Sequence, residues 1–299
     1  MLRASVIMPC FNHATFLRDS VNGILQQTEA DLELIIVDDC SSDNSWDVIR
    51  SVADSDPRIR AIRHERNQGA SRSRNDALQV AKGEFIGFCD ADDIWEPDKL
   101  RIQVNLLQNH PKYDLVYCDT TIIDENGLPT NQRFSALFPP PKLASGWLFG
   151  ELVLRNFINI QSVLMRNQCV QRVGHFDERI KWVEDWSYWI RVSHDHQFLY
   201  SQEPLARYRV HRKSTSVVQK RGYRFNRYKV FKKTLRGYAD ISRCMKADIL
   251  YKMGVELYAL GKIRAGRRLF LNAIRLAIGD RRAYKTLGKA LFRMITGRA

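Results

Sequence analysis

The stretch EFIGFCDADDIWEPDKL, residues 84–100, joins a short apolar run directly to the aspartates Asp90, Asp92 and Asp93. The apolar run has the length of a buried strand, and a helical pattern follows it over residues 99–108. Carboxylates crowded at the end of a strand repel one another unless a cation lies among them. The stretch therefore predicts a strand, a divalent metal site at its carboxyl end, and a helix.

Short apolar runs alternate with helical patterns on either side of this stretch. Strands are expected at residues 4–10, 32–37, 59–64, 84–89 and 115–118, and helices at residues 16–27, 46–53, 69–82 and 99–108. This alternation predicts βαβ units, and hence an α/β fold with a mostly parallel sheet flanked by helices. After residue 128 the pattern is less regular, with a short helix expected at residues 146–157, strands at 161–165 and 205–210, and helices at 184–193 and beyond 220.

Ligands of open α/β sheets bind outside the carboxyl ends of the strands, so the residues that follow each strand are candidates for a site. These residues are Pro9 and Asn12, Asp38 and Asp39, and Asp90, Asp92 and Asp93. The chain contains neither a G-x-G-x-x-G nor a G-x-x-x-x-G-K-[ST] sequence, which argues against dinucleotide-binding and P-loop proteins. The carboxylates predict Mg²⁺ or Mn²⁺ carrying a nucleotide diphosphate, with Asp38 accepting hydrogen bonds from a base or ribose. Solvated turn and N-cap residues are the alternative for each aspartate taken alone.

Five segments resemble the motifs of family 2 glycosyltransferases of the GT-A fold, in the same order and at similar spacing. They are SVIMPCFN (5–12), ELIIVDDCSSD (33–43), RNQGASRSRN (66–75), FIGFCDADDIWEPDKL (85–100) and WVEDWSYWIRV (182–192). The resemblance covers residues 3–215. It implies a GT-A fold and an inverting, metal-dependent hexosyltransferase that uses a nucleotide-sugar donor, with a UDP-sugar favoured.

The resemblance also implies roles for individual residues. Asp38 contacts the base, Asp90 the ribose, and Asp92 the metal, while Asp185 is the catalytic base with Glu184 beside it. Inverting transfer by single displacement needs a base for the acceptor hydroxyl, and the departing diphosphate needs charge neutralisation. Stabilisation of the helix dipole in a first turn is the alternative for Glu184 and Asp185.

Further residues are expected to complete the site. Arg74 and Asn75 lie near the rim if the fold is right, and Arg209, His211 and Ser216 resemble a segment that closes over the diphosphate, so these five are expected to bind the donor. Arginine suits a diphosphate because its planar fork makes bidentate bonds, although an ordinary basic loop is the alternative. Trp182 and Trp186 flank the expected base, and at least one is expected to line the acceptor site, with core packing as the alternative.

The charge is distributed unevenly along the 299 residues. Lys and Arg number 47 against 33 Asp and Glu overall, but residues 205–299 hold 26 against 4. Over residues 264–277, four arginines occupy one stripe of a helix: Arg264, Arg267, Arg268 and Arg275. This basic amphipathic helix either docks on an anionic membrane surface or packs on the rest of the protein. Without a recognisable nucleic-acid-binding motif, no nucleic-acid partner is expected.

These features predict a GT-A catalytic domain at residues 1–218, with nucleotide-binding and acceptor-binding halves at 1–125 and 126–218, and a basic helical extension at 219–299. No apolar run of 18 residues and no secretory signal is found, so a cytoplasmic protein on the inner face of the membrane is expected. The acceptor is expected to be a glycan or lipid-linked molecule in cell-surface polysaccharide synthesis. A nucleotidyltransferase, or a sugar- or nucleic-acid-binding module without turnover, is the alternative function.

Overall fold

The structure, a computed structural model, describes residues 2–142, 144–212, 214 and 220–278, together with residues 286, 288, 289, 292 and 293. The chain divides into two compact units. Unit 1 comprises Met1–Leu148, Phe157–Glu178 and Glu184–Arg212, and unit 2 comprises Phe149–Asn156, Arg179–Val183 and Lys213–Ala299. The catalytic domain expected at residues 1–218 and its two halves stay a prediction.

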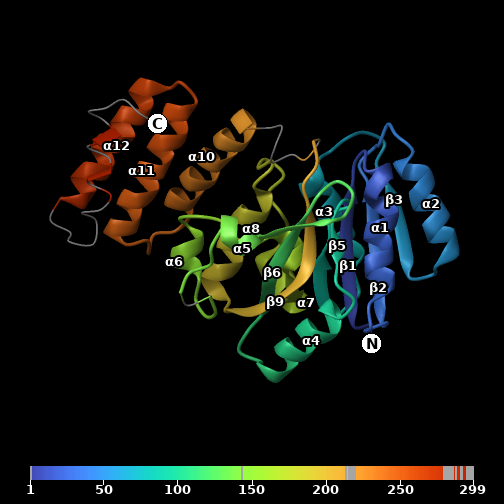
Figure 1. Cartoon of the computed structure of the whole chain (residues 1–299). Helices are drawn as coiled ribbons and strands as arrows, with labels where there is room; N and C mark the ends of the chain where they lie inside the picture. The colour runs from blue at the N-terminus through green and yellow to red at the C-terminus, as the bar shows by residue number, and fades with distance from the viewer. Residues whose placement is uncertain are drawn as a thin grey trace. The chain divides into compact units, whose positions relative to one another are not determined.

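Unit 1 contains the sheet and most of the helices (Figure 1). Its elements in chain order are β1 (Ala4–Cys10), α1 (Ala14–Leu25), β2 (Leu32–Asp38), α2 (Ser45–Ser55), β3 (Ile59–Arg63), α3 (Ala70–Val80), β4 (Phe85–Phe88), β5 (Ile94–Trp95), α4 (Lys99–Asn109), β6 (Leu115–Ile123), β7 (Pro129–Arg133), α5 (Phe134–Leu137), the 3₁₀ turn η1 (Ile160–Ser162), β8 (Leu164–Arg166), α7 (Asn167–Val173), α8 (Glu184–Asp195) and β9 (Phe198–Arg209).

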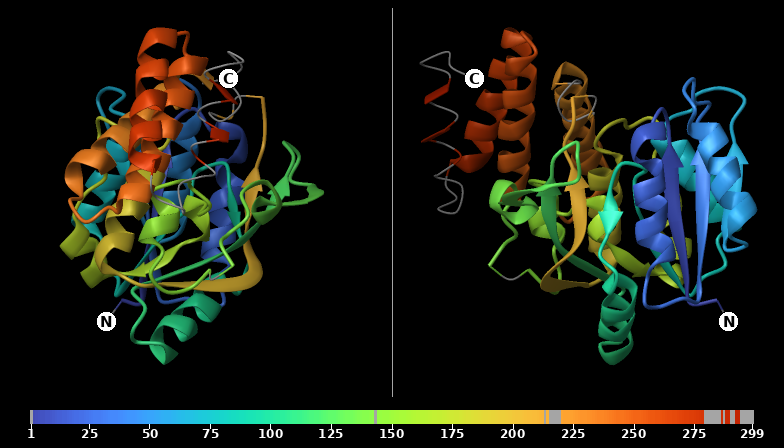
Figure 2. Two further views of the ribbon diagram at one scale, coloured as in Figure 1. Left: turned by 90° about the vertical axis from the view of Figure 1, so that its left-hand side faces the viewer. Right: turned by 45° about the vertical axis from the view of Figure 1, so that its right-hand side comes forward.

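Nine strands among the described residues form one sheet, in the order β3-β2-β1-β4-β8-β6-β9-β5, with β7 paired to β6. Strands β1 to β4 are mutually parallel, whereas β8 is antiparallel to β4, and β6 and β9 run parallel side by side (Figure 2). The predicted α/β fold is therefore confirmed, with its parallel order concentrated in the N-terminal half. That half has the continuous apolar strands that a sheet covered on both faces requires.

The alternation of side chains along β1 divides the core between the two faces of the sheet. Ala4, Val6 and Met8 belong to one apolar cluster with residues of α1, α2 and α4, including Leu17 and Ile49. The chain runs outward from β1 to β3 and then returns to β4 on the other side of β1. Because such crossovers are right-handed, the return helix α3 covers the opposite face. The carboxyl ends of β1 and β4 thus meet between two oppositely directed crossovers.

The regular elements of unit 2 among the described residues are helices, as predicted for the C-terminal part of the chain. Its helices are α6 (Phe149–Leu152), α10 (Lys220–Gly237), α11 (Arg243–Ala259) and α12 (Ile263–Ala277). The last two lie side by side (Figure 1) and approach closely at two glycines. A Cβ atom on Gly254 would lie 2.5 Å from the Phe270 ring, and one on Gly266 would lie 3.0 Å from the Gly254 carbonyl oxygen.

No helix in the described part of the chain has both the length and the apolar character needed to cross a bilayer.

Candidate active site

The site begins at the carboxyl ends of β1 and β4, which are adjacent strands of the sheet. The loop after β1 contains Asn12 and His13, and the turn after β4 runs from Asp90 to Asp93. Oppositely directed crossovers on either side of two adjacent strands leave a crevice at their carboxyl ends, which is where ligands of such sheets bind. The order of the strands therefore brings together the two segments that the sequence singled out.

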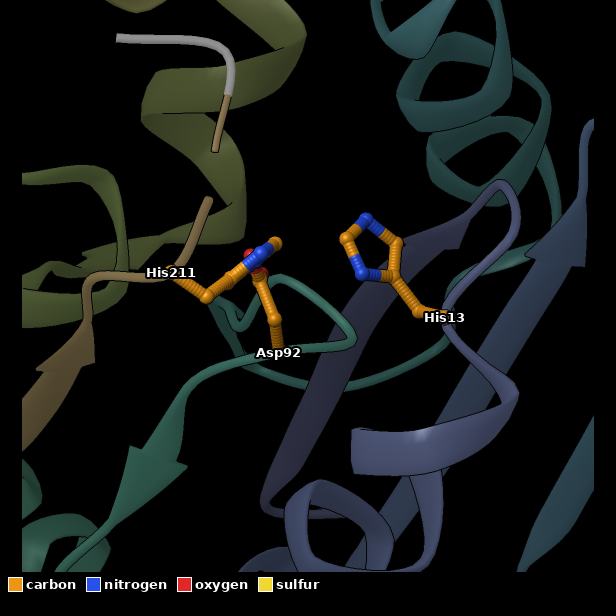
Figure 3. A group of neighbouring side chains, drawn as sticks. All are labelled: His13, Asp92 and His211. Atoms are coloured by element: carbon orange, nitrogen blue, oxygen red, sulfur yellow. The ribbon is translucent and has the colours of Figure 1, made fainter. Parts of the chain in front are cut away.

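Three side chains at this edge could hold a metal ion. One ligand atom each from His13, Asp92 and His211 lies within 4.8 Å of the others. The Nε2 atom of His211 is 3.1 Å from Oδ2 of Asp92, and the His13 ring faces both from the loop after β1 (Figure 3). Burial raises the pKa of Asp92, but the hydrogen bond from His211 and the nearby His13 lower it, and the net pKa is below its ordinary value. The carboxylate is thus held in the ionised form that a metal requires.

Strand β9 fixes the position of the Asp92 turn. Strand β5, directly after the turn, pairs with β9, with Ile94 opposite Arg207. Two residues later the main-chain N–H of Arg209 donates to Oδ1 of Asp93 at 2.8 Å, and its Nε donates to the carbonyl of Asp92 at 2.8 Å. This pairing sets the register that brings His211 to Asp92.

A network of short polar side chains fixes the loop that carries His13. The main-chain N–H of His13 donates to Oγ of Ser45 at 3.0 Å, and that of Asn12 donates to Oγ of Ser41 at 3.0 Å. Asn12 has a positive φ of 59°, and its Oδ1 accepts from the N–H of Ser42 at 2.8 Å. The loop after β1 is therefore tied to the loop after β2.

Asp38, the last residue of β2, is fully buried. Its Oδ2 lies 3.3 Å from both the N–H of Ser41 and Nε of Arg63, while its Oδ1 has no hydrogen-bond partner among the described residues. An open cavity of about 430 Å³ is lined by Arg63, His64, Glu65, Arg66 and Gln68. A buried carboxylate oxygen without a donor is costly, so this atom is a candidate to accept a hydrogen bond from a ligand.

Arg74 joins the two acidic motifs, which are far apart in the sequence. Its two terminal nitrogens donate to Oδ1 of Asp90 and to Oε1 of Glu184, each at 2.7 Å. Burial lowers the pKa of Arg74, but the two carboxylates raise it by more. The net pKa lies above its ordinary value, so the guanidinium stays charged. Because Glu184 and Asp185 begin α8, this bridge holds the start of that helix beside the turn after β4.

Several predicted site residues use their polar groups within the protein. Asn75 exchanges hydrogen bonds with the main chain of Phe176, at 3.1 and 2.8 Å. The Arg209 guanidinium also lies 3.2 Å from the carbonyl of Glu125, in addition to its contact with Asp92. Asn12 accepts from the loop after β2, as described above. The donor-binding roles of these three residues stay predictions.

The remaining predicted residues have the following positions. Pro9 lies in β1. Asp185 lies in the first turn of α8, where its Oδ1 accepts a hydrogen bond from the N–H of Trp186 at 2.7 Å. Trp186 is 2% exposed. Trp182 belongs to unit 2, where its ring occupies the space that a Cβ on Gly222 would need. Ser216 lies outside the described residues. The roles of all five stay predictions.

His13 is the candidate ligand that the sequence analysis missed. It follows directly on the PCFN segment, one residue beyond the last that was considered, and precedes α1. A histidine there reads as an ordinary residue before a helix, and nothing local indicates which way its ring points. The signal in the sequence is its place one residue past the Asn12 that follows the strand.

Curated proteins similar to this chain include three glycosyltransferases. An uncharacterized glycosyltransferase of Methanocaldococcus jannaschii is 30% identical over 212 residues, covering 69% of this chain and 70% of that protein. The putative teichuronic acid biosynthesis glycosyltransferase TuaG of Bacillus subtilis is 28% identical over 240 residues, covering 80% and 88%. The UDP-Glc:α-D-GlcNAc-diphosphoundecaprenol β-1,3-glucosyltransferase WfgD of Escherichia coli is 37% identical over 124 residues, covering 42% and 48%.

Two solved structures have a similar fold. Residues 1–349 of Staphylococcus aureus TarS, in complex with UDP-GlcNAc, superpose with a TM-score of 0.66 at 18% identity, covering 99% of this chain and 92% of that one. The mannosyltransferase PcManGT from Pyrobaculum calidifontis, in complex with GDP-Man and Mn²⁺, gives a TM-score of 0.63 at 16% identity, covering 99% and 88%. These likenesses confirm the GT-A fold class.

A sequence profile of the glycosyl transferase family 2 matches residues 5–166, more than half of the chain. This match and the relatives above confirm the resemblance found in the motifs, and they argue against the alternative of a nucleotidyltransferase. The chain belongs to glycosyl transferase family 2.

Proposed function

We propose that this glycosyltransferase transfers a hexose, with inversion, from a UDP-sugar to a hydroxyl group of a glycan or lipid-linked acceptor, in cell-surface polysaccharide synthesis. The observation that carries the proposal is the Arg74 bridge, which joins Asp90, after β4, to Glu184, the neighbour of the proposed base. The names of TuaG and WfgD, and the UDP-GlcNAc bound to TarS, support the choice of donor and acceptor class.

Asp38 is proposed to select the base of the donor. Its Oδ1 has no hydrogen-bond partner among the described residues, and its neighbour Arg63 lines an open cavity. Uracil has an N–H at ring position 3, whereas cytosine has a bare acceptor nitrogen there. A carboxylate opposite that acceptor would leave both groups unpaired, and an unpaired buried group costs about 1–3 kcal/mol. Asp38 therefore favours UDP over CDP.

The donor set at the metal site fits a divalent cation, because it combines an ionised carboxylate with imidazole nitrogens. Asp92 and His211 are proposed to hold the ion. A divalent metal supplies Lewis-acid neutralisation of the charge that develops on the departing diphosphate. Arg209 keeps the Asp92 turn in place, and Asp90, held by Arg74, is proposed to accept hydrogen bonds from the ribose.

Asp185 is proposed to act as the general base. It takes the proton of the acceptor hydroxyl as that oxygen bonds to the anomeric carbon, while the bond from the anomeric carbon to the diphosphate oxygen breaks and its electron pair leaves with UDP. Glu184 is fixed by Arg74 and is proposed to position the first turn of α8. Such a base contributes typically 10²–10⁴-fold to the rate.

Helix α12 is proposed to dock on an anionic membrane surface, on the cytoplasmic side. Its stripe of four arginines, defined above, is exposed, and the buried face carries Gly266, Phe270, Ala273 and Ala277. Leu271, 42% exposed, falls within the arginine stripe at helical spacing, and Ile278, 58% exposed, follows directly on the helix. Arginines interleaved with exposed apolar residues are typical of helices that lie in a lipid interface.

The donor assignment is tested by calorimetric titration of UDP, GDP, CDP and dTDP into the full-length protein, with Mn²⁺, with Mg²⁺ and with EDTA. We expect metal-dependent binding of UDP, weaker binding of CDP, loss of the metal dependence in Asp92→Ala, and reduced discrimination between UDP and CDP in Asp38→Asn. The control is Asp47→Asn, which alters an exposed carboxylate on α2. Equal affinity for all four nucleotides in the wild type would exclude base selection by Asp38.

The catalytic assignment is tested by Asp185→Asn. The amide keeps the shape of the side chain but cannot take a proton, so we expect turnover to fall by about 10²–10⁴ while the affinity for UDP stays within a few-fold. Single-turnover rates with a competent acceptor and calorimetry with UDP measure the two effects separately. Turnover near that of the wild type would remove Asp185 from this role.

A further inference from the structure

The metal site has one more side chain around it than the proposed function uses. We infer that His13 is a third protein ligand, so that the site is His13–Asp92–His211 and binds a first-row transition ion such as Mn²⁺ in preference to Mg²⁺, without needing the nucleotide. This inference rests on the proposed metal site at Asp92 and names the chemistry of its ion.

The distances allow all three side chains to reach one ion. Their ligand atoms lie within 4.8 Å of one another. Metal–ligand bonds of about 2.1 Å put two ligands on opposite sides of an ion about 4.2 Å apart and two adjacent ones about 3 Å apart. The longest separation therefore exceeds the bound distance by at most about 0.6 Å for opposite ligands and about 1.8 Å for adjacent ones, a range that rotation of imidazole side chains can cover.

The three side chains come from separate segments that the fold already holds in place. His13 follows β1, Asp92 lies in the turn after β4, and His211 follows β9 (Figure 3). The hydrogen bond from the His13 N–H to Ser45 anchors the first, and the contacts of Arg209 anchor the second. A site assembled before the ion arrives loses little conformational entropy when the ion binds.

The two histidine rings lie edge to face, close to Asp92. Their ring centroids are 6.0 Å apart with the planes at 84°, and the His211 ring also packs on Phe16 at 4.8 Å. Two imidazoles and one carboxylate are also the donor set of known transition-ion sites.

The donor set decides which ion is preferred. Mg²⁺ favours oxygen ligands and retains its waters, whereas imidazole nitrogen suits transition ions. Two imidazoles and one carboxylate therefore disfavour Mg²⁺. Without His13, the described residues would offer Asp92 and His211 as ligands, and the nucleotide would have to supply more of the remaining contacts. With His13, binding of Mn²⁺ to the free protein is expected.

The inference is tested by titrating Mn²⁺ and Mg²⁺ into the full-length protein without nucleotide, with calorimetry and the electron paramagnetic resonance signal of free Mn²⁺ as readouts. We expect the wild type to bind Mn²⁺ at least about tenfold more tightly than Mg²⁺. His13→Gln should weaken Mn²⁺ binding at least about tenfold, with a smaller effect on Mg²⁺. The matched control, His110→Gln, changes an exposed histidine at the end of α4 and should leave both affinities unchanged.

A second variant addresses the case in which His13→Gln folds poorly, as judged by thermal unfolding. His13→Asp replaces the nitrogen ligand with oxygen and should shift the preference toward Mg²⁺. Wild-type affinity for Mn²⁺ in His13→Gln, or an unchanged ratio of the two affinities in His13→Asp, would overturn the inference.

Titration of UDP distinguishes this failure from failure of the proposed function. If UDP binding depends on metal in the wild type but Mn²⁺ affinity does not depend on His13, the proposed function stands and the third ligand is excluded. If UDP binding is indifferent to metal and to Asp92→Ala, the proposed metal site itself is wrong, and the inference falls with it.

Discussion

Arg74 lies between two carboxylates, and its side chain is only 4% exposed. A buried cation that pairs with two anions stabilises the fold mainly because, without it, the negative charges of both anions would be uncompensated. Because Asp90 and Glu184 belong to segments 94 positions apart, the same guanidinium also fixes the distance between the proposed ribose contact and the start of α8. A single side chain thus connects two parts of the proposed site.

Removing the Arg74 charge should therefore reduce both the stability of the protein and its activity. In Arg74→Gln we expect a loss of stability of about 3 kcal/mol, the low end for breaking a buried pair, since Asp90 remains partly solvated. Affinity for UDP and turnover should fall together, and adding Glu184→Gln should recover part of the stability but not the turnover. Urea denaturation and single-turnover rates measure these effects.

Arg72→Gln is the control for this experiment, because Arg72 lies on the same helix, is more exposed and pairs with Asp76. Its stability should stay within about 0.5 kcal/mol of the wild type. If Arg74→Gln behaved like this control, the bridge would have no structural or positioning role.

For single residues, the sequence predicted which side chains lie at the edge of the sheet better than it predicted their hydrogen-bond partners. Asp38, Asp90 and Asp92 could be assigned to one edge because each follows an apolar run, and the ends of parallel strands meet. The partners of Asn75 could not be predicted, since Phe176 lies 101 positions away and only the finished fold brings it within 3.1 Å. His13 was missed for the same reason: its relation to His211 depends on the register of β9.

At the scale of elements, the first turn of α4 contains an unusual buried charge. Lys99 is fully buried, its Nζ donates to Oε1 of Gln103 at 2.5 Å, and it lies 3.9 Å from the centre of the Trp95 ring. Burial lowers the pKa of Lys99 to about 8, although Cys118 and Cys89 act in the opposite direction. The helix therefore starts with an ammonium group that is poorly solvated at neutral pH.

This charge predicts a dependence of stability on pH. An unfolded lysine titrates near 10.4, so between pH 8 and pH 10 the unfolded chain binds more protons at this residue than the folded one, and stability rises with pH. Below pH 8 the cost is fully present. We expect the free energy of unfolding of the wild type, relative to Lys99→Met, to increase by about 2–3 kcal/mol from pH 7.5 to pH 10.

Urea denaturation of both proteins across this range measures the effect, and the comparison cancels the contribution of titrating groups that do not interact with Lys99. The loss of the hydrogen bond to Gln103 in Lys99→Met shifts stability equally at each pH. Parallel curves for the two proteins would mean that Lys99 titrates normally in the folded state.

The bounds of helices and strands with a clear hydrophobic periodicity were predicted closely. The bounds of elements that depend on pairing with another strand were not. The helix expected at residues 46–53 is α2 (Ser45–Ser55), and the strand expected at 59–64 is β3 (Ile59–Arg63). The strand expected at 205–210 begins at Phe198, because pairing with β6 continues through a polar stretch that has no strand pattern of its own. Local periodicity cannot report such pairing.

At the scale of the whole molecule, the charge of unit 2 leads to a prediction about membranes. Replacing the four stripe arginines of α12 by Gln should weaken binding to anionic vesicles by on the order of 10²–10³, at about 1 kcal/mol for each charge near the surface. The difference should shrink as salt rises, because the Debye length is about 8 Å at physiological ionic strength. Thermal stability should change little, since exposed charges contribute little to folding.

Vesicle co-sedimentation at low and high salt measures the effect. The matched control removes the same total charge from exposed arginines of unit 1: Arg18, Arg50, Arg60 and Arg101. We expect this control to sediment like the wild type. Equal sedimentation of the wild type and the α12 variant would reject docking through this helix.

The interleaving of the two units has a consequence for the order in which the chain is made. Phe149–Asn156 and Arg179–Val183 belong to unit 2, yet they are synthesised before its long helices. At about 5–20 residues per second, these segments wait on the order of ten seconds for their partners to leave the ribosome. Leu152 and Val153, fully buried in the finished protein, are without part of their final surroundings during that time. A messenger truncated after codon 212 would leave the surroundings of these two side chains permanently incomplete.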